Sequence, residues 1–176
     1  GRGRLASEHA FCAVAALAVA VLFFMPVFPT FMLIDWLDVD AIAVRPLLED
    51  GSISAWQAFG LRLFKFFALS LPASLVFILA TVLLSALIRW TFLPRIRAGS
   101  WPVHSNLYLA KWLVNQIQES SLAVLHGIYA TVYSAAWYRL LGARVGKETE
   151  LSTALGVVPD MLTLGDGCFI ADAVML

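Results

Sequence analysis

An aliphatic residue recurs at every sixth position through the last part of the chain. The series is Val145, Leu151 and Val157, and after one seven-residue step Leu164, Ile170 and Leu176. This period fits neither an amphipathic helix nor a simple alternating strand. It fits a triangular parallel β-helix, in which each flat face takes about six residues and three faces close one coil. We therefore predict that residues 141–176 form the start of a parallel β-helix with these side chains inside.

Other positions of the repeat follow from the same geometry. The position four residues after an aliphatic residue also points inward, which applies to Thr149, Leu155, Cys168 and Val174. The extra residue of the longer step lies around Pro159–Asp160, where an outward bulge would keep the register. Asp160, Asp166 and Asp172 are expected to act as turn and corner residues that bond to the backbone. Cys168 is expected to fill space in the core rather than to accept an acyl group.

Two uncharged segments precede the repeat. Hydrophobic residues make up 61% of the chain and charged residues 14%, against about half and about a quarter in a soluble domain. No charge occurs between His9 and Asp35, or between Lys65 and Arg89. Both segments are long enough to cross a hydrocarbon core of about 30 Å as helices. We predict a membrane anchor over residues 1–100, with spans at about 10–34 and 66–88, the first kinked by its prolines.

The charges around these segments predict an orientation. Residues 53–65 mix aromatic and basic side chains, which favours a helix at the membrane interface. Five carboxylates lie in the loop before it, whereas arginines flank the outer ends of the two spans. The positive-inside rule then places both ends of the chain on the cytoplasmic side of the plasma membrane. The net charge of zero argues against nucleic acid as a partner.

Residues 101–140 are predicted to form amphipathic helices on the membrane surface. One helical stripe carries Lys111, Asn115, Gln118 and Glu119, and the opposite stripe carries Leu109, Trp112, Leu113 and Ile117. The uncharged stretch 120–138 leaves a third span open as an alternative. Arg95, Arg97 and Lys111 are candidates to contact anionic lipid headgroups of the cytoplasmic leaflet or a carrier phosphopantetheine. We favour the lipid headgroups.

Two parts of the sequence resemble known protein families. "LGARVGKETELST" and "LGDGCFIADAVML" resemble the hexapeptide-repeat acyltransferases, whose β-helix is left-handed. The stretch from about Leu93 onward, including "LPRIRAGSWPVHSNLYLAKWLV", resembles the membrane-embedded C-terminal region of poly-lysine-synthetase-type nonribosomal peptide synthetases. That resemblance implies amide-bond formation between carrier-bound and free amino acids. It implies that the full-length protein uses ATP and phosphopantetheine, and that this chain itself holds no cofactor. It also implies a carrier-bound aminoacyl thioester as a partner.

Candidate catalytic residues are few. Acyl transfer favours a base that titrates near neutral pH, and His104 in "WPVHSN" is the weak candidate. His9 is expected at the membrane interface and His126 in helix packing. The two cysteines have neither disulfide nor metal-ligand spacing. We expect the chain to be a fragment that is inactive alone.

Two other functions stay open. One is a free-standing membrane acyltransferase of the hexapeptide-repeat class, which would use acyl-CoA. The other is a non-catalytic anchor whose β-helix associates into a homo-oligomer.

Overall fold

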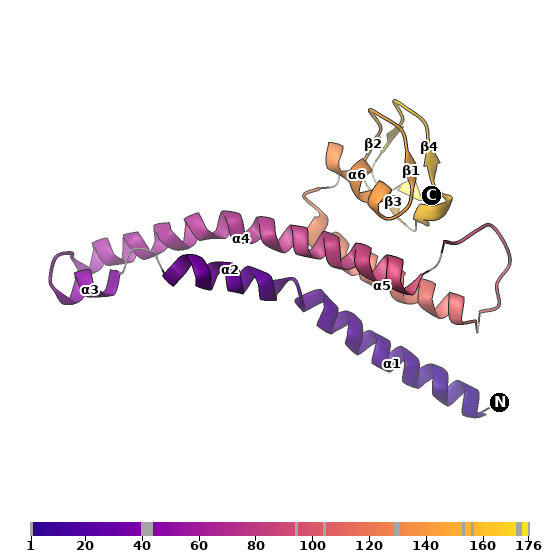
Figure 1. Ribbon diagram of the computed structural model, residues 1–176, viewed down its shortest axis with the longest axis horizontal. Helices are drawn as coiled ribbons and strands as arrows, with labels where there is room; N and C mark the ends of the chain where they lie inside the picture. The colour runs from indigo at the N-terminus through magenta and orange to yellow at the C-terminus, as the bar shows by residue number, and fades with distance from the viewer. Residues whose placement is uncertain are drawn as a thin grey trace. The chain divides into compact units, whose positions relative to one another are not determined.

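The computed structural model describes residues 2–39, 44–93, 95–103, 105–128, 131–152, 154–155, 157–171 and 174–175. The chain forms two units, one of Phe24–Ala80 and the other of Gly1–Phe23 with Thr81–Leu176. Six helices come first along the described chain and six short strands last (Figure 1). The described structure is therefore mostly helical, with its strands confined to the C-terminal part.

The first apolar segment contains two helices. Helix α1 covers Arg2–Phe24 and α2 covers Val27–Val39, with a turn at Met25–Pro26 between them. Pro26 has no N–H to donate to the preceding turn, and the Phe28 N–H donates to the Met25 carbonyl instead, at 3.1 Å. The predicted proline kink is thus a break between two helices.

A short helix and a glycine turn lead to the second apolar segment. Helix α3 covers Val44–Glu49 within the region predicted to be a loop. Gly51 follows in the left-handed region (φ 70°). The Ser54 N–H then donates to Gln57 Oε1 at 2.8 Å, and the Gln57 N–H donates to Ser54 Oγ at 3.3 Å. This reciprocal pair is a capping box, and it determines where the next helix begins.

Helix α4 is continuous over Ala55–Phe92 and contains Pro72. The sequence predicted two pieces here, an interfacial helix at 53–65 and a span at 66–88. The structure joins them, because Arg62 and Lys65 change the polarity of the helix surface without interrupting its backbone hydrogen bonds. The boundary predicted between Lys65 and Phe66 is therefore a change of surface within one helix.

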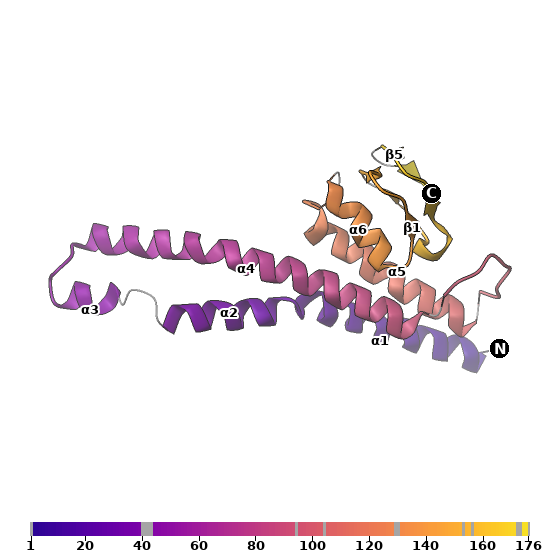
Figure 2. The ribbon, with the colours of Figure 1, turned by 45° about the horizontal axis from the view of Figure 1, so that its top comes forward.

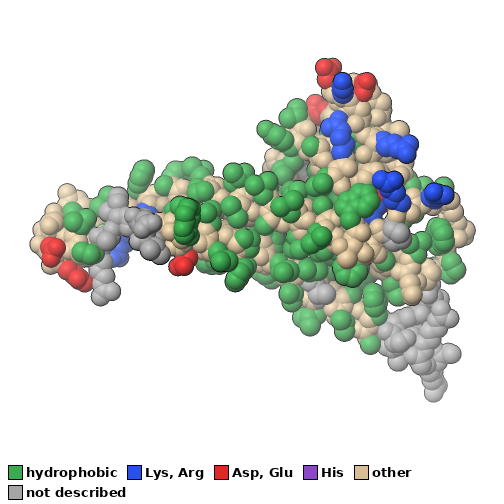
Figure 3. Space-filling model, in the orientation of Figure 1, with side chains coloured by type: hydrophobic (Ala, Val, Ile, Leu, Met, Phe, Trp, Pro, Cys, Tyr) green, Lys and Arg blue, Asp and Glu red, His purple; other side chains and the backbone are tan. Residues whose placement is uncertain are grey.

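Two described segments are long and apolar enough to cross a membrane, His9–Leu37 and Ala55–Phe92. Large apolar side chains remain exposed along them, among them Phe28 at 70% and Leu83 at 65%. In the face shown in Figure 3, hydrophobic side chains are spread along the helical part, and acidic side chains lie toward its left end and in the strand region. A soluble core would bury such side chains.

Helices α5 and α6 follow. Helix α5 covers Asn106–Leu125 and is capped by Ser105, whose Oγ accepts from the Tyr108 N–H at 3.2 Å. Helix α6 covers Val132–Leu140 and is capped by Thr131. The stretch 120–138 is thus divided between two helices. The buried stripe of α5 consists of Val114, Ile117, Ser121 and Leu125.

The stripe that α5 buries within the described chain differs from the apolar stripe predicted from the sequence, and its position on the membrane surface stays a prediction. Only Ile117 is shared with the apolar stripe predicted from the sequence, and Gln118 Nε2, predicted on the polar stripe, is buried. Hydropathy alone does not say which side of a helix meets its neighbours when apolar residues surround much of it. The small polar Ser121 lies inside because its hydroxyl donates to the Gln118 carbonyl at 2.8 Å.

Six two-residue strands form three parallel sheets of two strands each. The first three strands are β1 (Arg144–Val145), β2 (Glu150–Leu151) and β3 (Ala154–Leu155). After the 3₁₀ turn η1 (Pro159–Met161), they are followed by β4 (Thr163–Leu164), β5 (Phe169–Ile170) and β6 (Val174–Met175). β1 pairs with β4, β2 with β5 and β3 with β6. The chain therefore passes three sheets in order and then passes them again. Figure 2 shows this strand region next to α6.

The pairing matches the six-residue period in two of the sheets. Val145 lies opposite Leu164, and Leu151 lies opposite Ile170, as the period predicts once η1 takes up the extra residue. In the third sheet Leu155 lies opposite Met175 rather than Val174. The second connection is one residue longer than the first here, with three residues between β5 and β6 against two between β2 and β3.

Helix α6 packs against β1 and β2. Ser134 Oγ donates to the Leu151 carbonyl at 2.7 Å, and Arg139 Nε donates to the Val145 carbonyl at 2.8 Å. Arg139 also donates to the Gly146 carbonyl. N–H groups of the first pass donate to carbonyls of the second pass, whereas these three carbonyls accept from α6. Helix α6 thus covers a strand edge that would otherwise expose backbone acceptors.

One corner of the two passes is stacked through backbone contacts. Glu148 (φ 52°) and Gly167 (φ 66°) hold equivalent left-handed positions, nineteen residues apart like the Val145–Leu164 pair. The Gly167 N–H donates to the Lys147 carbonyl at 2.9 Å, and the Lys147 N–H donates to Asp166 Oδ1 at 2.6 Å. Asp166 is therefore a turn residue as predicted, and the backbone it binds belongs to the preceding pass.

Candidate functional site

The C-terminal end of α4 meets the strand region through a buried ion pair. Arg89 is 1% exposed, and its Nη2 pairs with Asp160 Oδ2, on a side chain that is 5% exposed. Arg89 Nη1 also donates to the Leu93 carbonyl at 2.6 Å. Arg89 Nε has no hydrogen-bond partner among the described residues. The arginine is thus held by one carboxylate and one carbonyl at the helix end.

Asp160 binds a second segment as well. Its Oδ2 accepts from the Ile96 N–H at 3.0 Å, which fixes the loop after α4. Its Oδ1 lies against Gly142, where an added Cβ would be 3.0 Å away and φ is 111°. The Trp90 Nε1–H donates to the Leu140 carbonyl at 3.0 Å on the same side of the site. Three parts of the chain, the α4 end, the α6 end and η1, therefore meet at one carboxylate.

This junction is stabilised by an ion pair that is buried from solvent. Removing one partner of a buried ion pair costs about 3–5 kcal/mol, because the other charge stays buried and uncompensated. The rings of Trp90 add to the pair, with the Arg89 guanidinium carbon 4.9 Å from the ring centroid and the Arg95 carbon 5.9 Å away. The junction fixes the loop 95–99 that follows, and that loop lines a groove.

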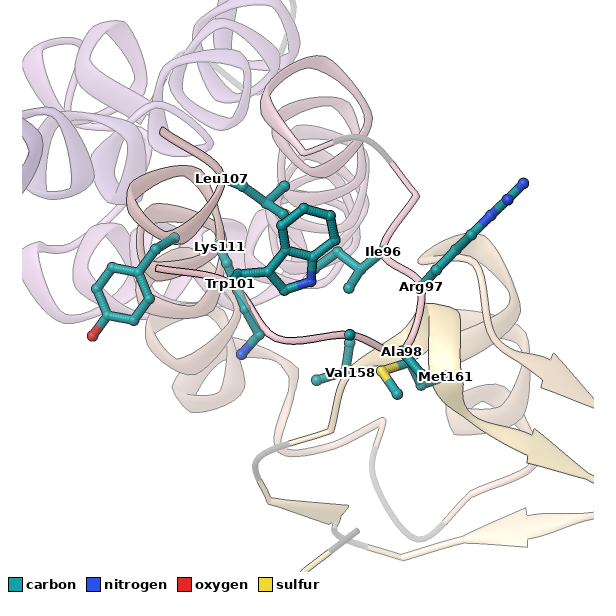
Figure 4. Close-up of a pocket in the computed structure, with 10 residues that line it drawn as sticks. Ile96, Arg97, Ala98, Trp101, Leu107, Lys111, Val158 and Met161 are labelled. Atoms are coloured by element: carbon teal, nitrogen blue, oxygen red, sulfur yellow. The ribbon is translucent and has the colours of Figure 1, made fainter. Parts of the chain in front are cut away.

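The groove beside this loop has a volume of about 280 Å³. We call it the Trp101 groove. It is lined by the loop residues, by the first turns of α5 and by two residues next to or within η1, namely Ile96, Arg97, Ala98, Gly99, Trp101, Leu107, Tyr108, Lys111, Val158 and Met161. Figure 4 shows Trp101 at its centre, with Leu107 and Ile96 on one side and Val158 and Met161 on the other. A smaller hollow of about 210 Å³ shares Val158 and Met161.

The chemistry of the Trp101 groove is that of a binding site. Its lining is mostly apolar, and its two charged residues, Arg97 and Lys111, are both basic. Among the described residues that line it there is no His, Asp, Glu, Cys or Ser to act as base or nucleophile. The groove can therefore receive an amphipathic molecule with an anionic group.

The predicted catalytic candidate, His104, lies outside the described residues. His126 is exposed at the C-cap of α5, so the packing role expected for it was wrong. Cys168 is half-buried and not disulfide-bonded. No cluster of three or more potential metal ligands occurs in the described part of the chain.

Sequence reasoning missed the Arg89–Asp160 pair. Arg89 was interpreted only as a cytoplasmic flank of the second span, and Asp160 only as a turn residue. The two residues are 71 positions apart, and no local pattern links them. One signal was present in the sequence. Asp160 falls at the single seven-residue step of the six-residue period, and the repeat itself does not explain a residue inserted at that step.

Comparison with known proteins indicates the class of protein that the chain resembles. The chain is similar to a poly-amino-acid synthetase, whereas no family model and no solved structure matches it. The relative is the delta-poly-L-ornithine synthetase of Acinetobacter baumannii (strain AB307-0294), with 45% identity over 173 residues. The aligned region is 98% of this chain and 12% of that protein.

Proposed function

We propose that this chain is the membrane-anchored part of a synthetase that joins amino acids into a poly-amino acid. The observation that carries the proposal is the 45% identity to delta-poly-L-ornithine synthetase across nearly the whole chain. The name of that relative also favours a diamino acid, such as ornithine or lysine, as the substrate. Because the chain spans 12% of the relative, the activity belongs to the whole synthetase rather than to this segment.

The anchor consists of the two apolar segments, His9–Leu37 and Ala55–Phe92, embedded in the lipid bilayer. Their exposed apolar side chains and the absence of charge over more than twenty residues support this assignment. Both ends of the chain lie on the cytoplasmic side, supported by the arginines that flank the spans. Helices α5 and α6 then lie at the membrane surface.

The strand region is the first part of a left-handed parallel β-helix. Each strand of the first pass pairs in parallel with the equivalent strand of the second pass, which supports this proposal. The six-residue period also matches the register in two of the three sheets. The role of the strand region in the proposed synthetase is to support the reaction. In the whole protein, a free amine attacks a carrier-bound aminoacyl thioester; a C–N bond forms, the C–S bond breaks, and the thiol is released.

The test is made on membranes from cells that express the whole protein containing this chain. They are incubated with ATP and isotopically labelled ornithine or lysine, and the products are analysed by mass spectrometry. A ladder of labelled oligomers that requires ATP is the expected result. Transfer of an acyl group from acyl-CoA without ATP would contradict the proposal and favour a free-standing acyltransferase. Absence of both reactions in membrane-integrated protein would leave the oligomerising anchor as the better function.

A further inference from the structure

We propose that the Trp101 groove is a binding site for an anionic phospholipid of the cytoplasmic leaflet. This inference rests on the membrane anchoring proposed above, and it adds a specific ligand site to that anchor. The argument uses the position of the groove, its apolar lining and its charge.

The position of the groove follows from the end of α4. Helix α4 ends at Phe92, and Ile96, the first lining residue, follows four positions later. The buried Arg89–Asp160 pair and the Ile96–Asp160 hydrogen bond fix this loop directly at the helix end. If α4 spans the bilayer, the groove lies at the depth of the lipid headgroups.

The lining suits a lipid molecule. Ile96, Leu107, Val158 and Met161 offer an apolar surface for acyl chains. Trp101 and Tyr108 stay 55% and 43% exposed beside it. Aromatic side chains of this amphipathic kind are enriched where membrane meets water. The groove therefore combines an apolar lining with aromatic side chains suited to the membrane interface.

The charge of the groove selects a headgroup. Lys111 lies next to the Trp101 indole in Figure 4, whereas Arg97 points away from the other labelled side chains. Lys111 is thus the cation placed to meet a phosphate inside the groove, and Arg97, with Arg95 in the same loop, adds positive potential outside it. The nearby carboxylate of Asp160 is neutralised by Arg89. The site consequently favours an anionic headgroup over a zwitterionic one.

The test measures lipid binding by the whole purified protein in a neutral detergent. An acyl-labelled fluorescent phosphatidylglycerol is titrated and its anisotropy recorded, with phosphatidylcholine carrying the same label in parallel. Lys111→Gln is expected to weaken phosphatidylglycerol binding about tenfold and to change phosphatidylcholine binding less than twofold. Met161→Glu places a carboxylate in the groove and is expected to abolish the phosphatidylglycerol preference.

Matched controls lie on the same part of the chain but outside the groove. Arg144→Gln removes an exposed cation, and Phe169→Glu adds a carboxylate at a position that is 65% exposed. Both are expected to bind phosphatidylglycerol like the parent protein. A groove variant is compared only if its thermal unfolding midpoint lies within 2 °C of the parent; otherwise Lys111→Met, which keeps the aliphatic stem, replaces Lys111→Gln.

Two results would overturn the proposal. The first is equal loss of binding, or no loss, in the groove and control variants. The second is displacement of the lipid by free 4′-phosphopantetheine at micromolar concentration, which would assign the groove to a carrier arm. Carbonate extraction of the membranes separates this failure from failure of the anchor. A protein that stays in the membrane but lacks the lipid preference contradicts only the lipid site.

Discussion

Asp160 is the residue on which most of the described junction depends. It pairs with Arg89, accepts from the Ile96 N–H and lies against Gly142. Since a carboxylate has several acceptor positions, a single side chain can bind the helix end and the loop after it at once. A buried arginine next to an apolar helix is expensive without such a partner.

Replacing Asp160 by asparagine is expected to destabilise the protein by about 3–5 kcal/mol, since the buried Arg89 then lacks a counter-charge. The free energy of unfolding in detergent, measured by chemical denaturation, tests this. Glu150→Gln, at an exposed carboxylate of β2, is the control and should change the free energy by less than about 0.5 kcal/mol. Arg89→Met combined with Asp160→Leu should recover most of the loss. A single variant as stable as the parent would show that the pair does not hold the junction.

At the scale of elements, the two passes of strands approach each other closely at Gly146. A Cβ added there would lie 2.4 Å from both the carbonyl carbon and the carbonyl oxygen of Gly165, and 2.4 Å from Asp166 Oδ1. The equivalent position one pass later, Gly165, has only Cys168 Sγ nearby, at 3.9 Å. The close approach of the second pass therefore gives the glycine at position 146 a steric reason.

Gly146→Ala is accordingly expected to destabilise the strand region by about 1–3 kcal/mol, because backbone atoms of the next pass would have to move. Gly127→Ala, at a position where an added Cβ meets nothing within 4 Å, is the control and should be nearly neutral. Limited proteolysis and hydrogen exchange of the amides of β4 and β5 would report the loss locally. Equal protection in the two variants would contradict the described stacking.

At the scale of the whole molecule, the membrane assignment predicts which sites reagents can reach. The chain contains two cysteines, Cys12 in the first apolar segment and Cys168 in the strand region. In intact cells a membrane-impermeant maleimide should label an introduced Asp50→Cys and neither native cysteine. After permeabilisation Cys168 should react while Cys12 stays protected by lipid. The variant with both native cysteines replaced by alanine is the blank for the Asp50→Cys measurement. Labelling of Cys168 in intact cells would reverse the proposed orientation.

Much of the local architecture could be predicted from the sequence. Absence of charge marks the two long apolar segments, since hydrocarbon excludes charge whatever the fold around it. The proline break at Pro26 and the pairing of Val145 with Leu164 also follow from local chemistry and from a regular period. The continuity of helix α4 could not be predicted in this way, because the polarity of the side chains can change along a helix without interrupting its backbone hydrogen bonds.

The functional site was predicted only in part. The basic residues Arg97 and Lys111 were expected to meet lipid headgroups or a carrier arm, and the structure places both on one groove. Their apolar partners Val158 and Met161 come from the strand region, about fifty residues away along the chain. No sequence pattern connects them, because the contact depends on how the helix end meets η1.

The sequence by itself determined the apolar segments, the proline break and the repeat, because each depends on the solubility or geometry of neighbouring residues. Only the tertiary structure decided the burial of Arg89 against Asp160, the stripe of α5 that faces inward and the lining of the Trp101 groove. These features join residues far apart in the chain. Their free energy comes from charge pairing and packing, which exist only once the segments have met.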